Sequence, residues 1–164
     1  MRDKAAFEAA CRALHTRVAR YGRQIPVILT LTPSPVYAQV FSLPFLPPER
    51  LEEAARLNLR MISPIDFDSA YADWQMISIS DEGNGNNHSE ALGAFIEAKA
   101  ADAYREAVER AGFLVAAIEF APLSLTRVIQ ESADLDASSP YAVISFSADG
   151  ITFLVLRKGN LYFM

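Results

Sequence analysis

Three aspartates, Asp66, Asp68 and Asp73, lie within eight positions of one another in the segment SPIDFDSAYADWQM. Carboxylates this close in sequence could hold a divalent metal ion, or could supply the acid and the base of a hydrolase. No histidine joins them in this segment, whereas catalytic metal sites commonly add histidine to the ligand set. The alternative is a polar connection that leads into a half-buried strand.

The elements around these aspartates favour the polar connection. Pro64 ends the preceding helix, because the residue before a proline is pushed out of the helical conformation. The strand that follows alternates, with Trp74 on one face and Asp73 on the other. The other two aspartates lie in the connection before this strand, so the three carboxylates are not expected to meet.

Other groups that could do chemistry stand alone. His15 and His88 are far apart and have no partner at the spacing of metal ligands. The loop DEGNGNN, residues 81–87, lacks the alternating acids and the closing glutamate of a calcium loop. A single cysteine excludes an internal disulfide, and no Walker-type loop or Gly-x-Ser-x-Gly motif is present.

The composition is that of a globular chain without a surface for nucleic acid. Of 164 residues, 51% are hydrophobic and 21% are charged, and the net charge is −5 with scattered arginines. The longest apolar runs are strand-sized, far short of the roughly 20 residues that span a bilayer, so no direct membrane insertion is expected. The N-terminal segment has acids and arginines throughout and no export signal, which favours the cytoplasm.

Hydrophobic periodicity predicts a mixed α/β chain with a compact insertion. The run IPVILTL is almost continuously apolar, which suits a strand covered on both faces. In FSLPFLPP, Phe41 and Leu43 should be core by alternation, whereas Phe45 and Leu46 are candidates for contact with a partner. The expected helices are 4–21, 48–63, 101–112 and 122–131. The expected strands are 25–31, one between the prolines of the segment 32–44, 70–79, 91–100, 113–120, 141–146, 151–157 and 161–164.

This order of elements resembles the actin-like family of the type IV pilus assembly protein PilM and its relative FtsA. The resemblance covers roughly residues 25–164. It is carried by the stretches SLPFLPPERLEEAARLNLRMISPIDFDSAYADWQMI, ADAYREAVERAGFLVAAIEFAPLSLTRVI and VISFSADGITFLVLRKGNLYF. The Asp-Trp step in the first stretch is its most specific marker.

The resemblance implies part of an actin-like, ribonuclease-H-like lobe that carries an inserted subdomain of the strand–helix–strand–strand (SHS2) type. Residues 1–32 and 113–139 would be first-lobe elements, and residues 33–112 would be the insertion. Residues 140–164 would be the opening β-hairpin of the second lobe. Members of the family begin with a phosphate-binding hairpin and extend well beyond this point, so the chain is expected to be truncated or a cut-down relative.

The phosphate loop of the family, roughly Asp-Ile-Gly-Gly-Gly-Thr, aligns with SFSADG. Ser145 stands where the metal-orienting carboxylate would be, and Ser147 stands where the first glycine would be. A phosphate loop needs glycines so that backbone N–H groups can approach the oxygens. Asp149 and Gly150 remain, but such a step between strands is equally an ordinary hairpin turn. This degenerate remnant implies no catalysis and no cofactor, with ATP expected only if a complete protein restores the site.

The function implied by the resemblance is a non-catalytic assembly module of an inner-membrane pilus or secretion complex. Its partner would be the N-terminal cytoplasmic tail of a bitopic membrane protein, and the chain would be peripheral to the membrane through that partner. A scaffold of this kind could also form homo-oligomers. The alternative is a fragment of an actin-like ATPase whose nucleotide site needs segments absent from this sequence.

Overall fold

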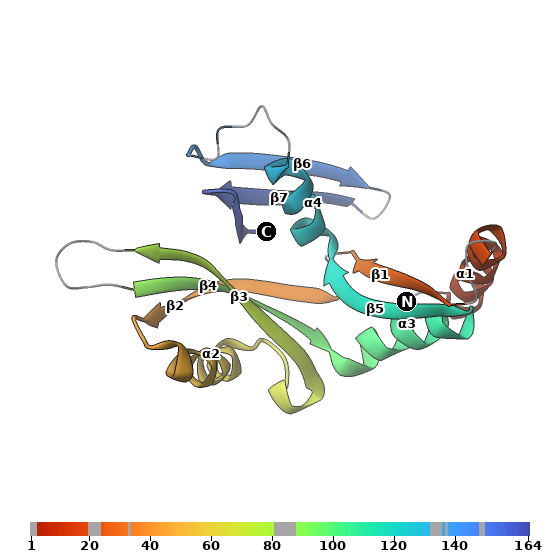
Figure 1. Cartoon of the computed structure of the whole chain (residues 1–164), viewed down its shortest axis with the longest axis horizontal. Coiled ribbons are helices and arrows are strands. Elements are labelled where there is room, and N and C mark those ends of the chain that lie inside the picture. The colour runs from red at the N-terminus through yellow and green to blue at the C-terminus, as the bar shows by residue number, and fades with distance from the viewer. Residues whose placement is uncertain are drawn as a thin grey trace.

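The computed structural model describes residues 3–19, 24–32, 34–80, 88–131, 136, 138–147 and 150–164. These residues form four α-helices and three small β-sheets (Figure 1). The helices are α1 (Lys4–Val18), α2 (Pro48–Ile62), α3 (Ala98–Arg110) and α4 (Ala121–Gln130), with a 3₁₀ turn at Phe67–Ser69. The strands are β1 (Ile25–Leu31), β2 (Val36–Pro44), β3 (Ala70–Ser80), β4 (His88–Glu97), β5 (Phe113–Phe120), β6 (Tyr141–Ser147), β7 (Gly150–Arg157) and β8 (Asn160–Phe163).

The parallel pair β1–β5 is covered on one face by α1 and α3. Val27, Leu29 and Val115 pack there with residues of both helices. The other face is open among the described residues, because β1 alternates between half-buried and exposed positions and Ile28 is 62% exposed. The prediction that this apolar strand is covered on both faces is therefore wrong for the described chain.

Helix α1 packs on β5 and α3 through a face slightly different from the predicted one. Asp3 caps its start by accepting a hydrogen bond from the Ala6 N–H at 2.9 Å. Leu14 recurs with Phe7, Cys11 and Val18 at spacings of three and four, which predicts it on the apolar face, but it is 53% exposed. His15 takes the inner position instead, with its ring edge-to-face on Phe113 at 5.0 Å between centroids. The end of α3 therefore meets an imidazole rather than a leucine.

The antiparallel sheet β2–β4–β3 forms the centre of the molecule, with β4 in the middle. The predicted core residues Phe41 and Leu43 are buried in it, as is Phe95. The two faces of β4 contact two different cores. Phe95 points to the cluster under α2, whereas Leu92 points to the cluster under β6–β8. The sequence order of β3 and β4 predicts that they pair as a hairpin, and they do pair antiparallel, with β4 beginning earlier than expected, at His88.

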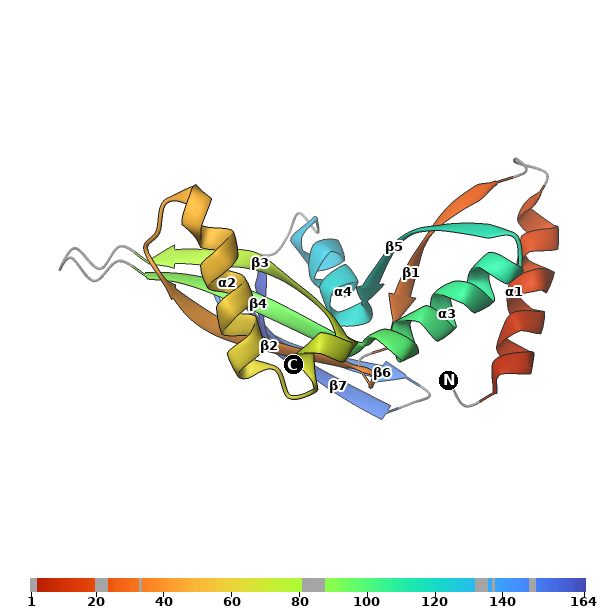
Figure 2. The same ribbon diagram turned by 90° about the horizontal axis from the view of Figure 1, so that it is seen from below.

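Helix α2 lies across one face of this sheet, and the strands β6 and β7 lie behind it (Figure 2). It begins at Pro48 and ends at Ile62 with Ser63 as its cap, as predicted. The buried side chains of Ala55 and Leu59 face the sheet. A Cβ on Gly93 of β4 would come within 2.5 Å of Leu59 Cδ2, so a glycine lets the helix approach this closely.

The C-terminal sheet β6–β7–β8 and helix α4 cover the other face. Leu154, Leu156 and Leu161 are each 1% exposed and form a core with Ile77 of β3 and Phe120 of β5. An irregularity of β3 between residues 76 and 78 breaks its alternation. Ile77 lies on the same face as Asp73 and Gln75, and beyond the break Ser78 pairs with Glu90 of β4.

The opposite side of the C-terminal sheet carries large apolar side chains that the described residues do not cover. In the strand register Ile144 lies opposite Phe153, and Phe146 lies opposite Ile151. These four and Phe163 are between 51% and 75% exposed. We call these five residues the outer apolar face.

A polar contact fastens the C-terminal sheet to the central one. Glu90 of β4 accepts hydrogen bonds from the Ser78 hydroxyl at 2.6 Å and from the Tyr162 hydroxyl at 2.9 Å. The bond from Ser78 lowers the pKa of Glu90 below its usual value near 4.5, burial opposes this, and the bond from Tyr162 adds to it. Asn160 donates to the carbonyl of Ile77 at 2.9 Å.

Because the folded pKa of Glu90 is lowered, its carboxylate stabilises the fold fully above the unfolded pKa, and this contribution is lost as pH falls from about 4.5 through the lowered value. We expect Glu90→Gln to reduce stability slightly at pH 7, by less than about 1 kcal/mol, and to make the acid-side loss of stability shallower. Thermal melts at pH 7 and at pH 3.5 measure both effects. Glu53→Gln on the exposed side of α2 is the control. If this control reduced the loss of stability between pH 7 and pH 3.5 by the same amount, the assignment of the effect to Glu90 would be contradicted.

Candidate functional site

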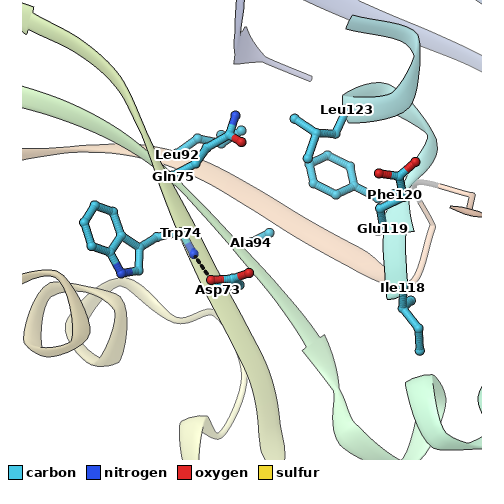
Figure 3. A pocket seen from close by; sticks show the side chains of 9 residues that line it. All are labelled: Asp73, Trp74, Gln75, Leu92, Ala94, Ile118, Glu119, Phe120 and Leu123. Carbon is cyan, nitrogen blue, oxygen red and sulfur yellow. Dashed lines mark hydrogen bonds between the residues drawn. The ribbon is translucent and has the colours of Figure 1, made fainter. Parts of the chain in front are cut away.

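A groove lies where the central sheet meets the end of β5 and the start of α4 (Figure 3). It consists of two adjoining hollows of about 130 and 230 Å³. Both hollows are lined by Asp73, Ala94, Ile118, Glu119 and Phe120. They therefore form one continuous site, which we call the groove.

The register of the central sheet decides which side chains enter the groove. Asp73 of β3 lies opposite Ala94 of β4, and Gln75 lies opposite Leu92. All four line the groove, whereas the Trp74 side chain packs on the other face with the α2 cluster. The small side chain of Ala94 leaves space between the two walls.

Apolar residues make up most of the groove lining. They come from elements far apart in the sequence, which meet only in the folded chain. The apolar lining residues are Leu31, Val36, Ala72, Trp74, Leu92, Ala94, Phe95, Ile96, Ala101, Ile118, Phe120 and Leu123. The remaining lining residues are Tyr71, Asp73, Gln75 and Glu119. None of the residues that line it is a lysine, arginine or histidine.

The carboxylate of Glu119 on the β5 wall is fully occupied by protein partners. It accepts hydrogen bonds from the hydroxyl of Ser124 and from the guanidinium of Arg127. Burial alone would raise the pKa of Glu119, but the bonds from Ser124 and Arg127, the charge of Arg127 and a bond from Thr30 together leave the pKa lowered. Glu119 is therefore ionised at neutral pH, with its charge balanced by Arg127.

Asp73 on the facing wall differs from Glu119 in its exposure and in its partners. Its carboxylate is exposed and accepts a hydrogen bond from the backbone N–H of Trp74 at 2.8 Å, drawn dashed in Figure 3. No lysine, arginine or histidine within the described ranges forms an ion pair with it. Asp73 thus presents a carboxylate without a cationic partner to the groove.

The other two aspartates of the opening segment do not join Asp73. Asp66 caps the 3₁₀ turn by accepting hydrogen bonds from the Asp68 N–H and the Ser69 hydroxyl. Asp68 forms an ion pair with Arg60 at 2.9 Å. Across the part of the chain that the structure describes, no three His, Cys, Asp or Glu side chains are placed to hold a metal ion. The prediction that the three acids do not converge is confirmed.

The residues aligned with the phosphate loop lie at the β6–β7 connection. Ser145 is half-buried inside β6, opposite Thr152. Ser147 pairs in register with Gly150, and its hydroxyl donates to the Gly150 carbonyl at 3.2 Å. Asp149 lies outside the described residues. The two strands that were predicted to flank the turn of the SFSADG segment are both present, and they pair antiparallel.

Phe45 and Leu46, the partner-binding candidates from the sequence, lie at the other end of the central sheet. Phe45 is 64% exposed and Leu46 is half-buried, just beyond the end of β2. The end of β2 pairs with His88, six residues along β4 from Ala94. At about 3.3 Å per residue, this is roughly 20 Å from the groove. A contact of these two residues with a partner would therefore be a separate surface.

Sequence reasoning did not find the wall of the groove formed by Ile118, Glu119, Phe120 and Leu123. The sequence contains one indication of the groove, on its opposite wall. Strand alternation placed the polar residues Asp73 and Gln75 on the face away from Trp74. Hydrophobic periodicity reports how far a residue is buried but does not say which distant segment faces it.

No protein-family model matches this sequence, and no curated protein matches it. Among solved structures, the chain is similar over 96% of its length to PilM in the PilM–PilN type IV pilus biogenesis complex, with a TM-score of 0.77 and 17% identity. It is similar over 94% of its length to the cytoplasmic domain of EpsL, an inner-membrane component of the type II secretion system of Vibrio cholerae, with a TM-score of 0.55 and 14% identity.

The chain covers 46% of the matched PilM chain and 55% of the EpsL domain, so it spans about half the length of each. None of the described helices is long and apolar enough to cross a membrane. At these identities the comparison establishes the fold. Over 94–96% of its own length, and about half of theirs, the chain has the mixed α/β, actin-like fold of PilM and of the EpsL domain.

Proposed function

We propose that this chain is a non-catalytic assembly module of a pilus or secretion complex, and that its groove binds the cytoplasmic tail of a membrane partner. The observation that carries the proposal is the groove itself, a largely apolar site between the central sheet and the β5–α4 wall. The fold likeness to PilM, solved in a complex with PilN, adds support. The chain would reach the inner membrane through this partner.

The groove has the features that bind an extended peptide. β3 is an outer strand of its sheet among the described residues, so a peptide strand can pair with its free edge. Alternate side chains of an extended segment point the same way, and could enter the two hollows in turn. Backbone pairing supplies affinity in such complexes, and the pockets for alternate side chains supply specificity.

The polar groups of the groove support binding rather than catalysis. Its lining includes no histidine, cysteine, serine or lysine that could act as a nucleophile or as a base near neutral pH. Glu119 is already held by Ser124 and Arg127. A nucleophile and base placed to act on one another, which most hydrolytic sites need, are not found among these lining residues.

The test is calorimetric titration of the folded chain with synthetic peptides. These would be the N-terminal cytoplasmic segments of the bitopic pilus and secretion proteins of its own organism. We expect one of them to bind, and Ala94→Trp to weaken that binding at least tenfold, because an indole would fill the space between the walls. Excess volume in a packed site typically costs about 1–3 kcal/mol, and 1.4 kcal/mol is tenfold in affinity.

Ala13→Trp, at an exposed position of α1, is the matched control and should bind as the wild type does. Circular dichroism and thermal melts establish that each variant is folded. If no such peptide binds to the folded wild-type chain, the proposal fails. Equal binding by Ala94→Trp would place the peptide elsewhere, with Phe45 and Leu46 as the next surface to vary.

A further inference from the structure

We infer that the groove selects a basic peptide, and that Asp73 is the residue that forms an ion pair with its positive charge. This inference rests on the proposed function and adds the chemistry of the occupant. The predicted ligand is an extended segment with a lysine or arginine at one position. An apolar residue should stand two positions away.

The charge balance of the groove carries the first step. Two carboxylates line it, and Glu119 is compensated by Arg127, which lies close enough for an ion pair. Asp73 has no such partner in the described chain, and no cationic side chain lines either hollow. Arg56 and Arg60 line a neighbouring hollow on the α2 side that Asp73 also borders. Arg60 pairs with Asp68, however, and neither arginine forms an ion pair with Asp73 among the described residues. An occupant that brings a cation would complete an ion pair at Asp73, whereas one that brings an acid would be repelled by this uncompensated carboxylate.

The position of Asp73 supplies the second step. Ala94 lies directly opposite it in the strand register, and Ile118 and Phe120 line the same hollows from the facing wall. The carboxylate therefore borders the apolar part of the groove. Side chains two positions apart in an extended peptide point the same way and stand roughly 7 Å apart. One can reach Asp73 while its neighbour enters the hollow beside Ala94.

The chemistry of the expected partner supplies the third step. Segments on the cytoplasmic side of a membrane span carry an excess of lysine and arginine within about 15–20 residues of the span. The chain has a net charge of −5, so long-range attraction and the local contact at Asp73 have the same sign. A cytoplasmic tail of this kind offers the cation that the groove lacks.

The experiment is selection from a displayed library of random ten-residue peptides, with the folded wild-type chain and four variants as separate baits. For wild type we expect enriched sequences that share a lysine or arginine two positions from an apolar residue. The bait Asp73→Lys should reverse this preference and enrich aspartate or glutamate at that position. Asp73→Asn should lose the preference for charge and keep the one for apolar residues. Glu53→Gln, which removes an exposed acid of α2, should select as wild type does.

Ala94→Trp, the fourth variant, separates failure of this inference from failure of the proposed function. If wild type enriches no peptide, the groove is not a peptide site and both proposals fail. If peptides are enriched and the enrichment is lost in Ala94→Trp, the groove binds peptides. In that case, a wild-type selection without basic residues, or an unchanged selection by Asp73→Lys, overturns the inference about charge alone.

One selected peptide is then synthesised in two forms, with its basic residue and with glutamine in its place. Their affinities measure how much the contact with Asp73 contributes to binding. We expect Asp73→Asn and the glutamine peptide each to weaken binding by about 3- to 10-fold, as for a partly exposed charged pair. Applied together they should weaken it no further, because both remove the same contact. Raising the salt from 50 to 300 mM should weaken the wild-type pair and leave the doubly altered pair nearly unchanged. Additive losses in the double variant would overturn the assignment of the contact to Asp73.

Discussion

Replacing Phe95 with alanine is expected to lower the free energy of unfolding by about 3–5 kcal/mol, the usual range for a buried phenylalanine. Phe95 is 1% exposed in the middle strand of the central sheet, in the cluster beneath α2. Phe95 is also among the residues that line the larger hollow of the groove. Since small domains are typically stable by only about 5–15 kcal/mol, this single change should remove a large share of the stability. Urea-induced unfolding followed by circular dichroism measures it.

Phe45→Ala is the matched control, since it makes the same substitution at a side chain that is 64% exposed. It should change stability by no more than about 0.5 kcal/mol. A comparable loss at both positions would mean that Phe45 is packed in solution, against a second copy or another surface. A loss below about 1 kcal/mol for Phe95→Ala would contradict its place in the core.

The second large effect is expected at Gly112, where α3 turns into β5. Its φ is +102°, and a Cβ there would lie 2.8 Å from Cε1 and Nε2 of the His15 ring. Gly112→Val therefore combines a backbone conformation that β-branched residues avoid with a collision against a rigid ring. Together these should lower the free energy of unfolding by about 3 kcal/mol or more. Urea-induced unfolding is again the measurement.

Two further variants separate the backbone from the collision. Gly150 also has a positive φ, +138°, but none of the described residues places an atom within 4 Å of its Cβ position, so Gly150→Val reports backbone strain alone. In a His15→Ala background the collision at Gly112 is gone, and Gly112→Val should then cost less than it does in wild type. An unchanged cost in that background would show that His15 is not the obstacle.

Most of the elements follow from local sequence signals. The strand at 25–31 and the strand at 113–120 have the predicted bounds, and Pro48 and Pro64 set the two ends of α2. Gly112 ends α3 with the positive φ expected of a glycine after a helix. These features were predictable because each is determined by residues within a few positions.

The errors concern contacts between distant segments. The run of β1 is apolar throughout, but its neighbours in the described chain cover one face, and Ile28 stays exposed. The periodicity of α1 placed Leu14 inside, whereas the approach of α3 at Gly112 brings His15 there. A hydrophobic pattern does not say how a helix is rotated against a partner that arrives about 100 residues later in the chain.

The candidate site was half predictable for the same reason. Strand alternation placed Asp73 on the face away from Trp74, and the structure agrees. The wall opposite comes from Ile118 to Leu123, and nothing near Asp73 in the sequence points to it. The aspartates that first suggested catalysis are separated into a cap, an ion pair and a groove residue.

The outer apolar face affects how the folding of this chain can be assayed. Dyes such as ANS fluoresce on exposed apolar surface, and their binding is commonly taken as the mark of a molten globule. Here Phe146, Phe153 and Phe163 are more than half exposed in the folded chain, which is enough for such a dye to bind without any loosening of the core. A bright ANS signal together with a cooperative melt would therefore indicate the native protein.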